Sequence, residues 1–200
     1  TAAGQDVRLS FTPTASQPRI AVLVSNVTNP NATLNLWNGT STQSSISINN
    51  SPSGQTFFLD TQPVNANQQY QLWVQHSGSG IGSETMQIDN VPADLSQTVT
   101  VGGAAYPFTT VSGQNANITF TISSSESVTV HWTSGTYPST FNCFVQVTGP
   151  SPSTHQVGSG NCNRATGTVS LGTLSSGTYN ILVDPQAESS GGMSLTVTTP

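Results

Sequence analysis

The residues that could do chemistry in this chain are few, and the histidines come first among them. His76, His131 and His155 stand in unrelated contexts, and none has the spacing of a metal-binding motif such as HxH or HExxH. His131 alternates with Val130 and Trp132, which predicts that its imidazole points to solvent. We therefore expect no metal site built on histidine.

The carboxylates are also dispersed along the chain. Glycosidase chemistry needs two carboxylates held across a cleft, and calcium prefers clustered oxygen ligands. Asp89 and Asp94 flank a linker and are weak calcium candidates, but no DxDxDG-type loop accompanies them. We favour a plain solvated linker at this position. The eight acidic residues are Asp6, Asp60, Glu84, Asp89, Asp94, Glu126, Asp184 and Glu188.

Serine is so abundant that a nucleophile cannot be picked out by counting. No GxSxG elbow marks one serine as exposed on a strained turn. The abundance is better explained by the composition of β-surfaces and turns. We therefore expect no catalytic residue, no cofactor and no enzymatic activity.

The composition narrows the class of partner. Of the 200 residues, 58 are Ser or Thr, three are Arg and none is Lys, and the net charge is -5. Binding to nucleic acid or to an anionic membrane rests on basic residues, so neither is expected. No apolar segment approaches the roughly 20 residues that span a bilayer, so membrane insertion is not expected either.

The elements that position these residues are predicted to be short strands. Apolar residues make up 34% of the chain, many in period-2 runs, and helical periodicity is not sustained. About seven short strands in about 90 residues are typical of an antiparallel β-sandwich. In the first half we predict strands at Asp6–Thr12, Arg19–Ser25, Thr33–Trp37, Ser44–Ile48, Thr56–Asp60, Gln69–Gln75 and Glu84–Ile88. In the second half they are Asn115–Ile122, Ser127–Trp132, Asn142–Val147, His155–Gly158, Thr166–Ser170, Thr178–Val183 and Met193–Thr198.

The two halves of the chain repeat one outline at a constant offset of 109 residues. Phe11 corresponds to Phe120 and Tyr70 to Tyr179, and each Tyr opens an alternating apolar run followed by a Gly-rich turn. Self-similarity of this length indicates two copies of one domain. The fold class is therefore all-β, with two tandem antiparallel, immunoglobulin-like β-sandwiches. Their predicted ranges are 1–92 and 93–200, with the boundary near 91–96.

The connecting segment 90–110 holds a further strand candidate, Gln97–Val101. We expect it to supply the first strand of the second domain. Nothing in the sequence precedes Thr1 to do the same for the first domain, whose sheet should then lack its first strand and show an open edge. Either the sequence belongs to a longer array, or a neighbouring subunit supplies the strand by β-augmentation. We favour the longer array.

The two cysteines are Cys143 in "FNCFVQV" and Cys162 in "GNCNRAT". A disulfide closing that loop would contribute about 3 kcal/mol in the chain-entropy model. The alternative is two separate buried thiols. We favour the disulfide, because a Ser/Thr-rich, Lys-free β-protein suits an extracellular setting in which disulfides persist.

Alternation places the aromatic side chains on different faces. Trp132 shares a face with Val130 and is predicted to be core, whereas Trp37 and Trp73 point outward. Leu182 is the counterpart of Trp73 in the second copy and also points outward. These residues could be covered by a loop or domain, form a protein–protein interface, or form a platform for a sugar ring. An apolar residue at one outward position in both copies favours a repeated packing contact over a sugar site.

The stretches "GQNANITFT" and "GTYNILVDP…SSGGMSLTV" resemble the repeat of long bacterial surface and secreted proteins, including those with RHS-type repeats. That repeat is similar to the pre-peptidase C-terminal β-sandwich. The linker "NVPADLSQTVTVGG" and the cysteine pair also match, while the first copy has "QQYQLWVQHS" and no cysteines. The resemblance implies a pre-peptidase-like sandwich and an extracellular context but no reaction. Some domains of this family bind calcium, which is why Asp89 and Asp94 are considered as weak calcium candidates.

These observations favour a non-catalytic extracellular structural module of a surface, stalk or filament protein. Its partners would be copies of itself or neighbouring domains of a longer chain. The alternative is a carbohydrate- or substrate-binding accessory module of a secreted enzyme. That alternative predicts Trp37 and Trp73 exposed side by side with a glycan as ligand.

Overall fold

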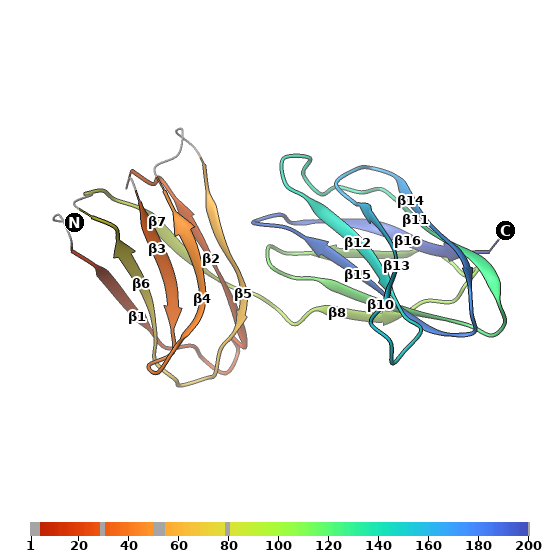
Figure 1. The fold of residues 1–200 in the computed structure, drawn as a ribbon, viewed down its shortest axis with the longest axis horizontal. Helices are drawn as coiled ribbons and strands as arrows, with labels where there is room; N and C mark the ends of the chain where they lie inside the picture. The colour runs from red at the N-terminus through yellow and green to blue at the C-terminus, as the bar shows by residue number, and fades with distance from the viewer. Residues whose placement is uncertain (1–4, 29–30, 50–54, 79–80, 200) are drawn as a thin grey trace. The chain divides into compact units, whose positions relative to one another are not determined.

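The computed structural model describes residues 5–28, 31–49, 55–78 and 81–199. Every regular element in these ranges is a β-strand, which confirms the all-β prediction. The chain divides into two compact units, Thr1–Ala93 and Asp94–Pro200, and each is a sandwich of two sheets (Figure 1). No helix long and apolar enough to cross a membrane is found in the described part of the chain.

Unit 1 is built from strands that pair antiparallel in two sheets, with the orders β1-β6-β3-β4 and β5-β2-β7. Strands β4 and β5 contact each other, so the two sheets meet on that side and β1 and β7 form the opposite side. We call this opposite side the β1/β7 edge. The strands are β1 (Val7–Phe11), β2 (Arg19–Ser25), β3 (Ala32–Trp37), β4 (Thr42–Ile48), β5 (Phe57–Pro63), β6 (Tyr70–His76) and β7 (Thr85–Asn90).

Unit 2 repeats this arrangement and adds two strands to it. Its sheets have the orders β13-β12-β15-β10-β8 and β14-β11-β16-β9, and only the pairing of β8 with β10 is parallel. Strands β13 and β14 close one side, and β8 and β9 lie at the other (Figure 1). The strands are β8 (Leu95–Thr98), β9 (Tyr106–Thr110), β10 (Ala116–Ile122), β11 (Glu126–Thr133), β12 (Cys143–Thr148), β13 (Gln156–Asn161), β14 (Gly167–Leu174), β15 (Gly177–Pro185) and β16 (Gly191–Thr198).

Equivalent strands of the two units pair in the same register. Phe11 lies opposite Tyr70 in unit 1, and Phe120 lies opposite Tyr179 in unit 2. Both aromatic pairs are stacked, with ring centroids 5.8 Å and 5.4 Å apart. The offset of 109 residues therefore reflects the same pairing of these strands in both units.

Each unit encloses its own apolar core, made by the inward positions of the alternating strands. The core of unit 1 includes Val22, Leu34, Leu36, Leu72 and Val74, and that of unit 2 includes Ile118, Phe120, Val130, Ile181 and Leu195. All of these side chains are at most 1% exposed. Trp132 also lies in the core of unit 2, as its alternation with Val130 predicts.

The segment that joins the two repeats differs from the prediction. The linker strand does supply a strand to unit 2, but it covers Leu95–Thr98 and not Gln97–Val101. Strand β9 is missing from the predicted strands, because Pro107 weakens the strand signal of its short run. The structure tolerates this proline because β9 is the outermost strand of its sheet.

Candidate interaction surfaces

The segment 94–110 closes one side of unit 2 by hydrogen-bonding to both sheets. The Val99 N–H donates to the Thr119 carbonyl of β10 at 2.8 Å, and the Gly102 N–H donates to the Val197 carbonyl of β16, also at 2.8 Å. The segment thus runs along one sheet, turns, and returns along the other.

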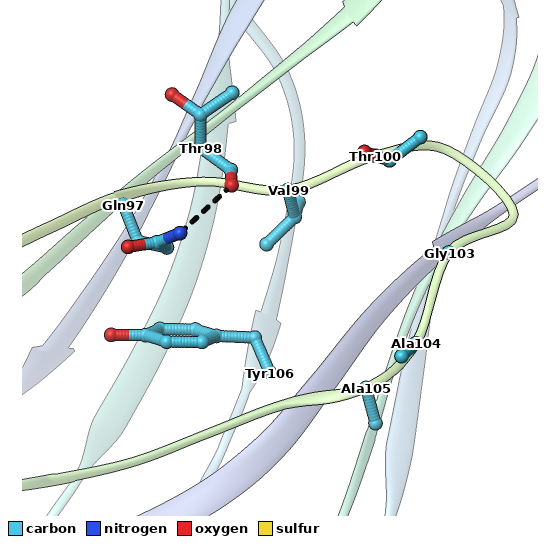
Figure 2. A pocket seen from close by; sticks show the side chains of 8 residues that line it. All are labelled: Gln97, Thr98, Val99, Thr100, Gly103, Ala104, Ala105 and Tyr106. Carbon is cyan, nitrogen blue, oxygen red and sulfur yellow. Dashed lines mark hydrogen bonds between the residues drawn. The ribbon is translucent and has the colours of Figure 1, made fainter.

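The same segment contributes apolar side chains to the core of unit 2. Phe108 belongs to the core cluster at 8% exposed, and the Tyr106 ring stacks on it with centroids 5.6 Å apart. Figure 2 shows Tyr106 facing Gln97 and Val99 across a shallow hollow between β8 and β9, about 220 Å³ in volume. Leu95, Val99, Val101 and Tyr106 are partly buried against the core.

The β1/β7 edge of unit 1 has no such cover among the described residues. Leu9 of β1 is 46% exposed, whereas its counterpart Ile118 in β10 is 0% exposed. Ile88 of β7 is 39% exposed, whereas its counterpart Val197 in β16 is 1% exposed. Strands β1 and β7 are the outermost strands of their sheets in the described chain. Core-type side chains are therefore left open to solvent along this edge.

Trp37 and Trp73 meet on the outer face of the β1-β6-β3-β4 sheet. Their rings lie edge to face at 89°, with centroids 6.4 Å apart, and both side chains are half-buried. The guanidinium of Arg8 lies 4.1 Å from the centre of the Trp73 ring, a cation–π contact. The Trp73 Nε1 donates to Asp6 Oδ2 at 3.1 Å. The face therefore presents two tryptophan rings in contact, and the ring of Trp73 is partly covered by Arg8.

Leu182 lies on strand β15 between the buried residues Ile181 and Val183, and it is half-buried. It occupies the outward position that corresponds to Trp73, since Asn117 and Leu182 pair as Arg8 and Trp73 do. The role assigned to Trp37, Trp73 and Leu182 as an interface or glycan platform stays a prediction.

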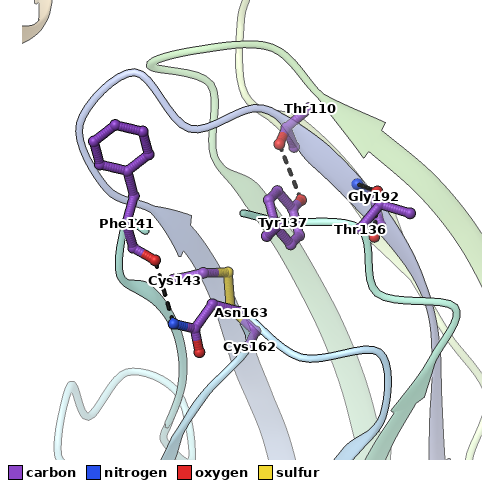
Figure 3. Close-up of a disulfide and its surroundings, with 8 residues drawn as sticks. All are labelled: Thr110, Thr136, Tyr137, Phe141, Cys143, Cys162, Asn163 and Gly192. Carbon is purple, nitrogen blue, oxygen red and sulfur yellow. Dashed lines mark hydrogen bonds between the residues drawn. A yellow bond between two sulfur atoms is a disulfide. The ribbon is translucent and has the colours of Figure 1, made fainter. Parts of the chain in front are cut away.

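The two cysteines form a disulfide between the start of β12 and the residue that follows β13. Cys143 and Cys162 are both 0% exposed, with Cα atoms 4.9 Å apart. The Cys162 N–H also donates to the Cys143 carbonyl at 2.7 Å, and Asn163 Nδ2 donates to the Phe141 carbonyl at 3.3 Å (Figure 3). The disulfide therefore fastens an edge strand to its neighbour.

Tyr137 is the one titratable group of the described chain with a clear pKa shift. Its side chain is 4% exposed, and burial raises the pKa of its phenol above the ordinary 10.0. The hydrogen bond between its hydroxyl and Thr110 Oγ1, 2.9 Å long, acts in the opposite direction but is the smaller influence (Figure 3). Because Tyr137 joins its loop to β9, this bond fastens the closing segment of unit 2.

The remaining titratable side chains are not gathered into a site. No group of three or more His, Cys, Asp and Glu side chains lies close enough to hold a metal ion in the described part of the chain. His131 Nε2 lies 3.0 Å from Thr198 Oγ1, and Asp89 Oδ1 accepts a hydrogen bond from Gln87 Nε2 at 2.6 Å. Asp94 Oδ1 accepts from the Asn115 N–H at 3.0 Å. Asp89 and Asp94 stay weak calcium candidates, and the plain solvated linker stays the prediction for this segment.

Comparisons with known proteins give likenesses of low identity. No protein-family model matches the sequence, and no curated protein matches it. The pre-peptidase C-terminal domain of a collagenase from Bacillus anthracis is similar with a TM-score of 0.40 and 12% identity, covering 55% of this chain and 99% of that one. The periplasmic g-type lysozyme inhibitor PliG of Aeromonas hydrophila gives 0.36 and 21%, covering 54% and 99%. The PBSX exported protein XepA gives 0.34 and 12%, covering 98% and 83%. At such values none of them assigns an activity to this chain.

The feature that sequence reasoning missed is the pair of residues through which β9 closes unit 2. Tyr106 and Phe108 alternate in "AYPFT", and that alternation was the available signal. The proline between them hides the signal, since proline in a run argues against a strand. The linker strand predicts an open edge beside β1, but without β9 the matching exposure beside β7 could not be foreseen.

Proposed function

We propose that this chain is a non-catalytic extracellular structural module of a surface, stalk or filament protein. It acts through contacts between neighbouring domains or subunits. The observation that carries the proposal is the exposed apolar β1/β7 edge of unit 1, in a chain that repeats the same sandwich in tandem. Uncovered strand edges with apolar side chains promote pairing with another chain unless charges or a cover protect them.

The composition and the disulfide support a location outside the cell, at a cell surface. Disulfides persist in oxidising surroundings, and Cys143 and Cys162 form one. The absence of Lys and the presence of only three Arg leave few sites for trypsin-like proteases. The resemblance to repeats of bacterial surface proteins, RHS-type proteins among them, points the same way.

The test is the solution mass of the purified chain by light scattering over a range of concentrations, with electron micrographs of the same samples. Concentration-dependent oligomers or filaments are expected if the segment assembles by itself. A stable monomer at the highest concentration would contradict self-assembly. If assemblies form, Leu9→Asp should reduce their measured mass. Val111→Asp, at a site 47% exposed in unit 2, should leave the mass unchanged.

A second candidate is a carbohydrate-binding accessory module, favoured by the contact between Trp37 and Trp73. Sugar rings stack on open aromatic faces. The edge-to-face contact of the two rings, with Arg8 over Trp73, leaves a smaller open aromatic surface for a sugar than two rings lying side by side would. Screening the chain against a glycan array tests this candidate directly. Binding lost in both Trp37→Ala and Trp73→Ala, but kept in Trp132→Phe, would support the candidate over the structural module.

A further inference from the structure

The equivalent edges of the two units differ in whether a segment of the chain covers them. Unit 2 carries segment 95–110 on its β10 and β16 side, whereas the matching β1/β7 edge of unit 1 carries nothing in the described chain. Of the four large apolar side chains that are exposed in the described residues, Leu9, Ile81 and Ile88 belong to unit 1, and only Val111 belongs to unit 2.

The register of unit 2 shows how such an edge is covered. Leu95 pairs with Ala116 and Thr98 with Thr119, in parallel along β10. Ala116 corresponds to Val7 and Thr119 to Ser10 at the offset of the repeat. A segment in the same register on unit 1 would therefore run parallel to β1 from Val7 to Ser10, over the exposed side chain of Leu9.

The return strand has its own counterpart on the other sheet. Tyr106 pairs with Leu195 and Phe108 with Met193 in unit 2, and Gly102 donates to Val197 before the return begins. Leu195 and Val197 correspond to Met86 and Ile88 of β7. An aromatic side chain entering here would cover the partly buried Met86 and the exposed Ile88 together.

We propose that the β1/β7 edge of unit 1 is an acceptor site for an extended peptide segment of the kind that covers unit 2, supplied from outside residues 5–199. The segment has the chemistry of residues 95–110: nearly uncharged, apolar at alternate positions, with a Gly turn and an aromatic pair on the return strand. It runs parallel to β1 and returns antiparallel to β7. The inference rests on the proposed function, because it names the site and the partner through which the module makes its contacts.

The chain's own segment 95–110 does not meet the need of unit 1. It is hydrogen-bonded to β10 and β16 and contributes Phe108 to the core of unit 2. Moving it to unit 1 would only expose Ile118 and Val197 in place of Leu9 and Ile88. One such segment serves one edge, so the second edge requires a segment from elsewhere.

The experiment uses the whole chain and a synthetic peptide, Asp94–Thr110, labelled at its N-terminus. Binding is measured by fluorescence anisotropy, and the site is located by amide hydrogen exchange. We expect saturable binding with new protection of the β1 and β7 amides, because the peptide pairs with both strands. A control peptide with Val99, Tyr106 and Phe108 replaced by Ser keeps the length and charge but should not bind.

Two protein variants test the site. Leu9→Asp and Ile88→Asp place a charge where the peptide would bury an apolar side chain, and each should weaken binding by about tenfold or more. Val111→Asp makes the same change at an exposed site of unit 2 and should alter the affinity less than about twofold. All three wild-type side chains are solvent-exposed in the chain alone, so the variants are expected to fold.

The outcomes separate this inference from the proposed function. Peptide protection at β1 and β7 supports the acceptor site even if the chain alone is a monomer. Absence of binding, equal binding of the control peptide, or binding unaffected by Leu9→Asp and Ile88→Asp overturns the acceptor site. If the chain assembles by itself but binds no peptide, the structural module stands and the partner is not an added strand pair.

Discussion

The hydroxyl of Tyr179 donates a hydrogen bond of 2.9 Å to the carbonyl oxygen of Ser175, four residues earlier in the chain. In unit 1 the equivalent Tyr70 accepts a hydrogen bond of 3.0 Å from the Asn65 N–H, five residues earlier. In both units a buried tyrosine thus fixes the loop that leads into its own strand, in the manner of the tyrosine corner of β-sandwiches. The tyrosine therefore recurs because its hydroxyl holds the loop that precedes β6 in unit 1 and β15 in unit 2.

Replacing Tyr179 by Phe should destabilise unit 2 by about 1 kcal/mol, because the ring stays and only the hydrogen bond is lost. Tyr70→Phe should do the same to unit 1. Urea unfolding combined with amide exchange distinguishes the units. A loss of protection in the unit that was not mutated, or no change in either, would contradict this role of the hydroxyl.

Much of the fold could be predicted from alternation and turn residues. The strands around Tyr70 and Tyr179 are predicted to within a few residues, because their apolar side chains alternate cleanly between buried and outward positions. The outward direction of Trp73 follows from the same alternation. That Trp37 and Trp73 touch could not be predicted, since their contact depends on how β3 pairs with β6.

The state of the two edges was not fully predictable either. Leu9 and Ile118 occupy equivalent positions in the repeat and have the same inward direction, yet only Ile118 is buried. Alternation tells which face of a strand points toward the core, but it does not tell whether another strand covers that face. For Ile118 the cover is β8, the linker strand that the sequence predicts beside β10. The second cover, β9, pairs with β16 through a long-range contact, and its proline hides it in the sequence.

Removing the disulfide should affect unit 2 alone. A bridge across a separation of 19 residues is worth about 3 kcal/mol, so Cys143→Ala with Cys162→Ala should lower the stability of unit 2 by about that amount. Amide exchange at Val145 should accelerate while that at Leu34 stays the same, because the two residues lie in separate cores. Reduction of the wild-type chain should reproduce the result. Equal acceleration in both units would show that the units unfold together.

Gly167 is required by the close approach of the Trp132 ring. A Cβ on Gly167 would overlap Cζ2 of Trp132, so Gly167→Ala should destabilise unit 2 by about 1–3 kcal/mol through overpacking. In a Trp132→Leu background the same substitution should cost less, because the ring is gone. A double-mutant cycle from urea unfolding measures the difference. Equal costs in both backgrounds would place the effect of the alanine elsewhere.

The buried phenol of Tyr137 makes the free energy of unfolding of unit 2 depend on pH in the alkaline range. Burial raises the pKa of its phenol, so the folded state keeps the proton to a higher pH than the unfolded chain does. Below the ordinary value of 10.0 both states are protonated, and the contribution of the group is fully present. Above that value the unfolded chain ionises first, so stability falls as the pH rises toward the folded pKa.

Tyr137→Phe removes this titration together with the hydrogen bond to Thr110. At pH 7 the variant should be less stable by about 1–3 kcal/mol, because the Thr110 hydroxyl, 4% exposed, is left buried without its partner. Between pH 9 and about pH 11 the wild type should lose stability faster than the variant, so the gap between them should narrow. Urea midpoints across this range check the sign. If the stability difference between wild type and variant widens with pH, the folded state stabilises the phenolate, and the pKa of Tyr137 is lowered instead of raised.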